Sequence, residues 1–260
     1  MHKVQLMKSS IDDIQERVLS LLAIDEDEEA EGILDPALSS NPQNPQLLTL
    51  DAILILRRGR EKAAESRLWK IVEMDPSNEL AVYTLGSILN SQLRVEAVEQ
   101  LYKNTLEKHP DSHQVMDDLC RFLYEEDRAE EAFKLAGAHR KRFPKVYEAY
   151  DAIRFLLHSV EDSLMGDVED TDGDTGYLNM LLSNLVEQAD LILEMEKQVG
   201  REKLESLNVA WEIDEELLRI AGELEHYKQV AKVVGLNLPT SLDSHIDEII
   251  KIGRSRSNLD

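Results

Sequence analysis

The sequence predicts an all-α protein, a right-handed α-solenoid of stacked helix pairs that ends in a C-terminal helical cap. One observation is a fixed proline spacing of 34 residues, shown by Pro42, Pro76, Pro110 and Pro144. A second is that apolar residues recur at helical spacing between these prolines. A period of this length predicts a repeated helix pair, and each pair buries its apolar face against the next.

Four units follow when the chain is cut after each proline-bearing turn: 11–44, 45–78, 79–112 and 113–146. Mostly small residues recur at the eighth and twentieth positions, where the two helices of a pair are expected to cross closely. They are Val18, Ala52, Gly86 and Cys120 at the eighth, then Ala30, Ala64, Val98 and Ala132 at the twentieth. These positions predict core packing, and Cys120 is therefore expected to be an inert buried thiol.

The four units resemble the tetratricopeptide repeat family, whose 34-residue units carry Leu-Gly, Ala and Pro at fixed positions. Leu85, Gly86 and Pro110 in the third unit are the best match, and the resemblance covers residues 11–146. The first unit departs most from the pattern. It carries Pro36 inside its second helix, where the missing N–H and a ring clash are expected to bend or break the helix.

Residues 1–44 are therefore expected to hold N-terminal helices that form a divergent repeat, and residues 45–146 three regular repeats. Ser10 is the expected N-cap of the first helix. Five consecutive carboxylates at residues 25–29 are typical of a solvated turn and helix start, and a docking patch for a basic peptide is the alternative.

The resemblance implies a concave groove lined by the first helices of successive units. The positions that face this groove in the family correspond to Gln46, Thr49, Ile53, Leu56, Leu80, Tyr83, Ser87, Asn90, Gln114, Asp117, Arg121 and Tyr124. Nine of the twelve, all except Gln46, Thr49 and Gln114, are the candidate binding residues.

This groove lacks the clamp of Lys, Asn and Arg with which some members of the family hold the terminal carboxylate of chaperone tails. Only Asn90 and Arg121 could contribute to one, and no lysine stands at any of the twelve positions. The mixture of apolar and polar residues instead predicts a groove for a helix or an extended peptide. The alternative is that some of these residues pack against another helix of the same chain.

The 34-residue period fails after residue 146. A further solenoid helix is expected over 147–165, followed by a flexible acidic loop over 166–176. The carboxylates of this loop imitate the middle of an EF-hand. The first and twelfth ligand positions would be Val168 and Asn179, which disfavours calcium.

Three helical stretches are expected in the remaining chain. They cover residues 177–199, then 202–234 with a bend near 222–226, then 242–252 with an end at Gly253. The interpretation we favour is that residues 177–260 cap the solenoid, which such arrays need for solubility. The alternative is a dimerisation surface on the apolar stripe of residues 177–199.

The charge and cysteine content exclude several classes of function. The chain has 29 basic and 52 acidic residues, a net charge of −23, which disfavours nucleic acids and anionic membranes as partners. A single cysteine excludes an internal disulfide. Without a signal-peptide pattern or a long apolar segment, the expected location is cytoplasmic, with no membrane insertion.

Motifs for catalysis are missing from the sequence, which has no nucleophile elbow, phosphate-binding glycine loop or zinc-protease pattern. His109 and His113 straddle Pro110 and therefore do not form a metal pair on one helix. We therefore predict a non-enzymatic scaffold or adaptor without cofactors, which binds a protein or peptide partner in its groove. The alternative is a structural subunit that oligomerises through its C-terminal helices.

Overall fold

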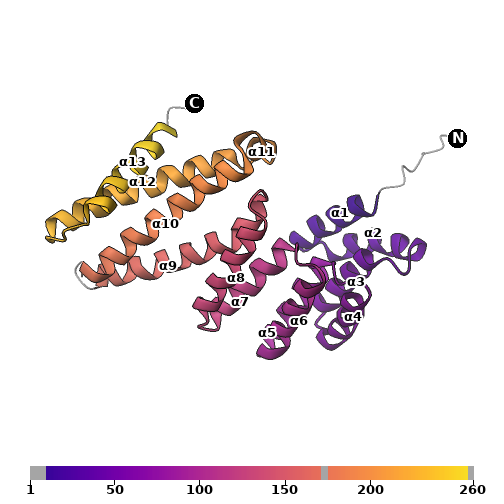
Figure 1. Ribbon diagram of the computed structural model, residues 1–260. Helices are drawn as coiled ribbons and strands as arrows, with labels where there is room; N and C mark the ends of the chain where they lie inside the picture. Colours follow the sequence, from indigo (N-terminus) through magenta and orange to yellow (C-terminus); the bar gives the residue numbers. More distant parts are fainter. Residues whose placement is uncertain (1–9, 171–174, 257–260) are drawn as a thin grey trace. The chain divides into compact units, whose positions relative to one another are not determined.

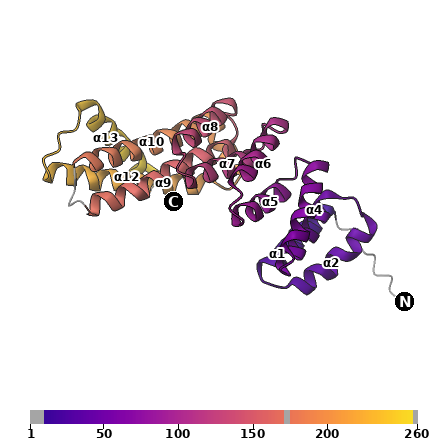
Figure 2. The same cartoon turned by 90° about the horizontal axis from the view of Figure 1, so that it is seen from below.

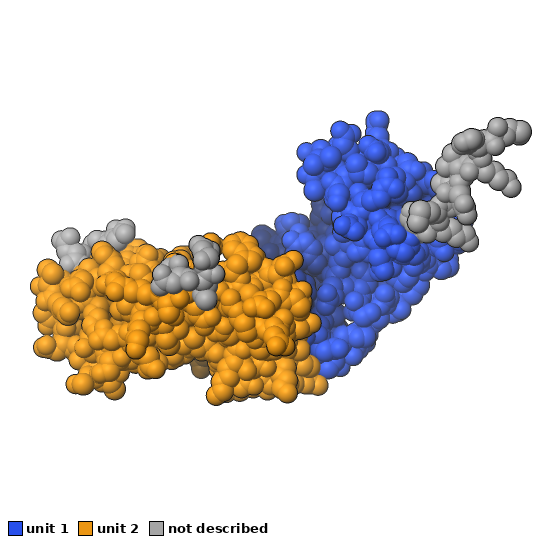
Figure 3. Space-filling model, turned by 90° about the horizontal axis from the view of Figure 1, so that it is seen from above, with its two compact units in different colours: residues 1–119 blue, residues 120–260 orange. Residues whose placement is uncertain are grey.

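The computed structural model describes residues 10–170 and 175–256, and these residues form helices and connecting turns without any strand. The all-α prediction is thereby confirmed. The chain divides into two compact units, residues 1–119 and 120–260 (Figure 3). Each unit is described by itself below.

Eight helices form the repeated pairs: α1 (Ile11–Ala23), α2 (Asp27–Ser40), α3 (Pro45–Arg57), α4 (Glu61–Met74), α5 (Glu79–Ser91), α6 (Val95–Lys108), α7 (His113–Glu125) and α8 (Ala129–Arg142) (Figure 1). The first helices begin at residues 11, 45, 79 and 113, and the second helices at 27, 61, 95 and 129. Both series advance by 34 residues, so the proline period is also the period of the helix pairs.

The residues that cap these helices and those that form the turns between them follow the same period. Asn44 and Asn78 cap α3 and α5 by accepting hydrogen bonds from backbone N–H groups of the first turn. Each turn inside a pair uses one residue in the left-handed backbone region, namely Asp25, Gly59, Leu93 and Asp127. Only one of the four is glycine, so the backbone of this turn repeats although its residue type does not.

Pro36 does not break α2, which runs from Asp27 to Ser40, so of the expected bend or break the structure contradicts the break. The proline leaves the carbonyl of Gly32 without its usual partner. Both residues lie on the exposed side of the helix, and nothing packs beside Gly32. Water can therefore take over the lost hydrogen bond.

The core of unit 1 is built by helices that are neighbours in the chain. Within the pairs α1 packs on α2 (Figures 1 and 2), α3 on α4 and α5 on α6. The first helices also contact one another, α1 with α3 and α3 with α5 (Figure 1). The buried cluster at its N-terminal end consists of Val18, Leu22, Ala30, Leu34, Ala37, Leu47, Leu50 and Leu54. The first helices therefore share one side of the unit.

Unit 2 contains the end of α7, α8, η1 (Tyr147–Tyr150), α9 (Asp151–Asp170), α10 (Thr175–Val199), α11 (Arg201–Ser206), α12 (Ala210–Val233) and α13 (Thr240–Arg256). The long helices pack in chain order, α9 on α10, α10 on α12 and α12 on α13 (Figure 1). The fully buried Tyr150 ties η1 to the preceding turn, since its hydroxyl donates to the Pro144 carbonyl at 2.9 Å.

The acidic stretch 166–176 is mostly helical rather than a loop, which corrects the sequence prediction. Helix α9 continues to Asp170 and α10 begins at Thr175. Leu164 and Val168 are buried, so the apolar face of α9 passes through the acidic composition that suggested a loop. The middle of the imitated EF-hand, residues 171–174, lies outside the described residues.

Two further boundaries differ from the prediction. The stretch 202–234 is interrupted at residues 207–209, where Asn208 is left-handed, and not near Gly222, which lies inside α12. Helix α13 does not end at Gly253 but continues to Arg256. A Cβ atom on Gly253 would lie 2.5 Å from the Ala221 Cβ, so this glycine serves the close contact with α12 instead of ending the helix.

Candidate interaction surface

Three of the candidate binding residues form an exposed row on α5. Tyr83, Ser87 and Asn90 follow at intervals of four and three residues, which places them on one face of the helix. The Tyr83 side chain is 54% exposed, and Ser87 and Asn90 are also exposed. An aromatic ring, a hydroxyl and an amide are thus open to solvent on one side of unit 1.

Three aliphatic candidates accompany this row. Ile53 and Leu56 on α3 and Leu80 on α5 are half-buried. Ile53 and Leu80 pack against the N-terminal core cluster of unit 1, and α3 contacts α5 directly. We call the six residues Ile53, Leu56, Leu80, Tyr83, Ser87 and Asn90 the Tyr83 face.

The spacing of α3 and α5 is held by a buried polar contact. The Asn78 side chain donates to the Thr49 hydroxyl at 3.0 Å, and this hydroxyl in turn donates to the Pro45 carbonyl at 2.8 Å. Gln46 donates to Asp12 at 3.3 Å. These two groove positions of the family, Gln46 and Thr49, therefore join helices within the chain.

The three remaining candidates on α7 have other surroundings. Asp117 is buried, 8% exposed. In unit 2, the Arg121 guanidinium lies 3.9 Å from the centre of the Phe155 ring, and Tyr124 meets the same ring edge-on at 6.0 Å. Arg121 and Tyr124 thus pack against α9, as the alternative interpretation of the groove expects, and they stand in a different unit from the Tyr83 face.

The run of carboxylates at residues 25–29 is partly neutralised by the end of α3. Arg57 bonds both Asp25, at 2.5 Å, and Asp27, at 2.7 Å, and Arg58 bonds Glu31 at 2.6 Å. These pairs connect the turn of the first repeat to the second repeat. The structure therefore favours the solvated turn over a docking patch for a basic peptide.

A polar cluster that the sequence did not reveal lies inside unit 2. Glu161 on α9 is only 2% exposed and accepts from Arg219 on α12 and from Gln188 on α10, each at 2.7 Å. Glu216 on α12 is bonded by Arg154, at 2.6 Å. Partners 27 to 62 residues apart carry no local motif, which is why only the fold brings them together.

The same cluster holds one carboxylate in its charged form. Burial of Glu216 works against ionisation, but its hydrogen bonds with His158, at 2.7 Å, and with Arg154 lower its pKa from 4.5 to about 2. The space enclosed by these residues has no room for a water-sized molecule. The cluster therefore joins α9, α10 and α12.

Cys120 lies where the repeat pattern predicts. Its side chain is fully buried, and its thiol approaches the carbonyl of Ala132 at 3.6 Å. These two residues occupy the eighth and twentieth positions of one unit, so the predicted close crossing of α7 and α8 is confirmed.

Within the described ranges 10–170 and 175–256, no group of three or more His, Cys, Asp or Glu residues could hold a metal ion. None of the helices in those ranges is long and apolar enough to span a membrane.

Comparison with known proteins supports the resemblance seen in the repeats. The chain is 27% identical over 147 residues to tetratricopeptide repeat protein 21A of Mus musculus, a match that covers 50% of this chain and 11% of that protein. The chain thus spans about a tenth of that relative's length. No family model matches the chain.

Solved structures are similar only at low identity. A tetratricopeptide repeat protein from Parabacteroides merdae is 12% identical, with coverage of 94% of this chain and 98% of that one and a TM-score of 0.42. PilF of Pseudomonas aeruginosa is 16% identical, with coverage of 85% and 96% and a TM-score of 0.44. Naa15/Naa10 bound to HypK-THB is 14% identical, with coverage of 96% and 35% and a TM-score of 0.46. Nothing about the partners of this chain follows from them.

Proposed function

We propose that this chain, which resembles the tetratricopeptide repeat proteins, is a non-catalytic interaction scaffold whose Tyr83 face binds a peptide or helix of a partner protein. The observation that carries the proposal is the Tyr83 ring, which is 54% exposed on the same face of α5 as the half-buried Leu80. Ile53 and Leu56 are half-buried on α3, the helix that contacts α5. Large aromatic side chains in such settings are the usual anchors of protein interfaces.

The chemistry of the face indicates what it would hold. An apolar side chain of the partner packs against Tyr83 and Leu80, while Ser87 and Asn90 supply a hydroxyl and an amide for its polar groups. The clamp for a terminal carboxylate has no counterpart here, because Arg121 stacks on Phe155. We therefore expect an internal segment rather than a chain terminus as the ligand.

A subunit that assembles through its C-terminal helices is the alternative. Its predicted surface was the apolar stripe Leu178, Leu182, Leu185, Ala189 and Ile192 on α10. These five residues are buried inside unit 2, at most 2% exposed. The stripe is therefore used within the chain, and the observation favours the Tyr83 face as the working surface.

Affinity capture from the native lysate tests the proposal. The baits are the wild-type chain, the double variant Tyr83→Ala/Asn90→Ala, and the control Tyr177→Ala, which removes a 37% exposed tyrosine from unit 2. We expect a partner that wild type and control retain and the double variant loses. Light scattering on each free bait measures its oligomeric state.

Equal retention by all three baits would contradict the proposal. If the only retained species is a second copy of the chain, and it is lost with Tyr177→Ala, the self-assembling alternative holds instead. Arg121 is left unchanged because its contact with Phe155 makes it part of the fold of unit 2.

A further inference from the structure

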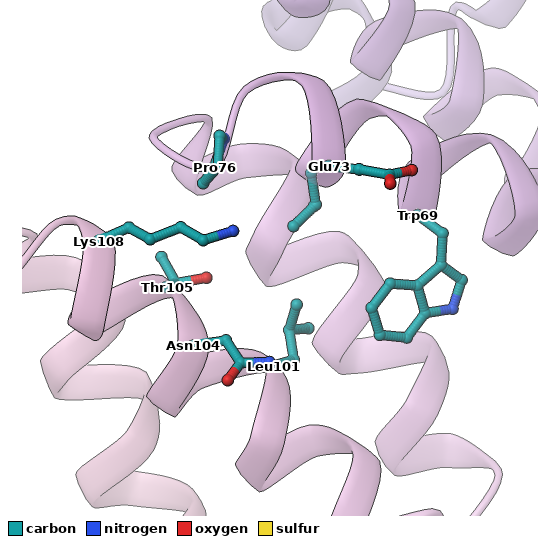
Figure 4. A pocket seen from close by; sticks show the side chains of 8 residues that line it. Trp69, Glu73, Pro76, Leu101, Asn104, Thr105 and Lys108 are labelled. Atoms are coloured by element: carbon teal, nitrogen blue, oxygen red, sulfur yellow. The ribbon is translucent and has the colours of Figure 1, made fainter.

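A pocket of about 280 Å³ lies on unit 1 between the second helices of two repeats (Figure 4). Trp69 and Val72 of α4, Pro76 of the following turn, and Leu101 and Thr105 of α6 form most of its lining. The Tyr83 face, by contrast, is built from first helices. We call this second site the Trp69 pocket.

The lining of the Trp69 pocket is largely apolar and partly open. Leu101 at the bottom is 3% exposed, whereas Trp69 remains 38% exposed. The Trp69 ring forms one side of the pocket, and Leu101 lies between it and Thr105 (Figure 4). Covering this surface with an apolar group would be favourable, since a large indole ring is left in contact with water.

Thr105 adds a polar group to the pocket. This residue is only 2% exposed, and its hydroxyl points into the pocket (Figure 4). Two other buried threonines, Thr49 and Thr84, donate their hydroxyls to the carbonyl four residues earlier, at 2.8 and 2.7 Å. No such side-chain bond joins Thr105 to any residue of the described ranges. A hydroxyl can donate one hydrogen bond and accept others, so this group can pair with a polar atom of a ligand in the pocket.

A positive and a negative side chain, Lys108 and Glu73, complete the rim of the pocket. In Figure 4 Lys108 extends towards the centre of the pocket, below Pro76, and Glu73 lies on the side of Trp69. Among the residues that the structure describes, neither Lys108 nor Glu73 forms an ion pair. Their charges are thus available to a ligand that carries both signs.

From this combination we infer that the Trp69 pocket is a second docking site, distinct from the Tyr83 face. Its occupant is an internal segment of a partner protein that inserts one phenylalanine- or leucine-sized side chain. An acidic residue on one side of this anchor pairs with Lys108, and a basic residue on the other side pairs with Glu73. The segment also gives the Thr105 hydroxyl a main-chain partner.

Tryptophan fluorescence tests this inference directly, because the chain contains only two tryptophans. In the full chain with Trp211→Phe, Trp69 is the sole reporter. The probe is the blocked peptide acetyl-Gly-Arg-Ser-Phe-Ser-Asp-Gly-amide, compared with the same peptide carrying Ala in place of Phe. We expect a saturable change of Trp69 emission, with affinity about tenfold or more lower for the Ala peptide, because its anchor side chain is lost.

Charge variants test the rim. Lys108→Glu and Glu73→Lys should each weaken the Phe peptide about two- to fivefold, as expected for an exposed ion pair. Lys62→Glu is the matched control, since Lys62 is an exposed lysine of α4 that does not line the pocket. Tyr83→Ala should leave the titration unchanged, so a failure here can be told from a failure of the Tyr83 face.

The inference is overturned if the Phe and Ala peptides titrate alike up to about 5 mM, the range of weak binding. It is equally overturned if Lys62→Glu weakens the Phe peptide as much as Lys108→Glu, because the effect would then come from net charge and not from the rim.

Discussion

Gly253 on α13 provides a sharp test of the packing in unit 2. A Cβ atom at this position would lie 2.5 Å from the Ala221 Cβ and 2.9 Å from the Leu217 carbonyl oxygen of α12. Carbon atoms in contact prefer about 3.5–4.0 Å, so the substitution Gly253→Ala must push α12 and α13 apart by about 1 Å. Overpacking of this kind costs about 1–3 kcal/mol.

The higher helix propensity of alanine offsets part of this cost in stability. Alanine is favoured over glycine inside a helix by about 1 kcal/mol. We therefore expect Gly253→Ala to lower the free energy of unfolding by up to about 2 kcal/mol, the difference between the strain and the gain. The matched control is Gly222→Ala on α12, where nothing lies within 4 Å of the added atom. That control should raise the free energy of unfolding by up to about 1 kcal/mol.

Urea unfolding gives the comparison. In a Trp69→Phe background the fluorescence comes from Trp211, at the beginning of α12 in unit 2. The reasoning fails if Gly253→Ala unfolds at the same urea concentration as Gly222→Ala, or at a higher one, with an unchanged slope.

Leu93 is 84% exposed and left-handed, at φ 56°, a conformation that asparagine adopts more readily than leucine. Leu93→Asn should therefore raise the free energy of unfolding of unit 1 by about 0.5–1 kcal/mol. Trp69 fluorescence in a Trp211→Phe background measures this change, and a loss of stability would contradict the strain argument. The pKa of Glu216 falls from 4.5 to about 2 on folding, so its contribution is fully present above pH 4.5 and is lost as the pH drops towards 2. The span from 4.5 to 2 corresponds to about 3 kcal/mol, which partial solvent access reduces to about 1–2 kcal/mol. Urea titrations of unit 2 between pH 5 and pH 2 should therefore show a steeper loss of stability for wild type than for Glu216→Gln, and equal slopes would refute this assignment.

The repeated part of the fold could be predicted closely because its determinants are local and periodic. Three determinants each act within one repeat. They are the asparagines before α3 and α5, the small residues at the helix crossing, and the prolines with their regular spacing. The helices consequently begin where the units were cut, at Ile11, Pro45, Glu79 and His113. The left-handed Leu93 could not be predicted, since the turn geometry alone requires this conformation there.

Amino-acid composition did not predict correctly where α9 and α13 end, because buried contacts matter at both places. The acidic stretch after Gly166 is typical of a loop, yet Val168 is buried and α9 continues to Asp170. Gly253 is typical of a helix end, yet its missing side chain serves the contact with α12. For Gly253 the deciding partner lies on another helix, so a local sequence pattern could not reveal it.

The candidate site was predictable only in part, for the same reason. The resemblance to tetratricopeptide repeats led to Tyr83, Ser87 and Asn90, which the structure places on one exposed row. The contact of Arg121 with Phe155 could not be predicted from this resemblance, because Phe155 lies outside the repeats. The sequence pattern did not predict the Trp69 pocket, because its lining combines residues of two repeats.

Site-specific photo-crosslinking is the measurement that tests the scaffold proposal most directly. A benzophenone amino acid replaces Tyr83 in one version of the chain and Tyr177 in another, and both are irradiated in native lysate. The proposal predicts an adduct from position 83 that maps to an internal segment with an apolar side chain, with no such adduct from position 177. Adducts to the same proteins from both positions, or only to a second copy of this chain, would contradict it.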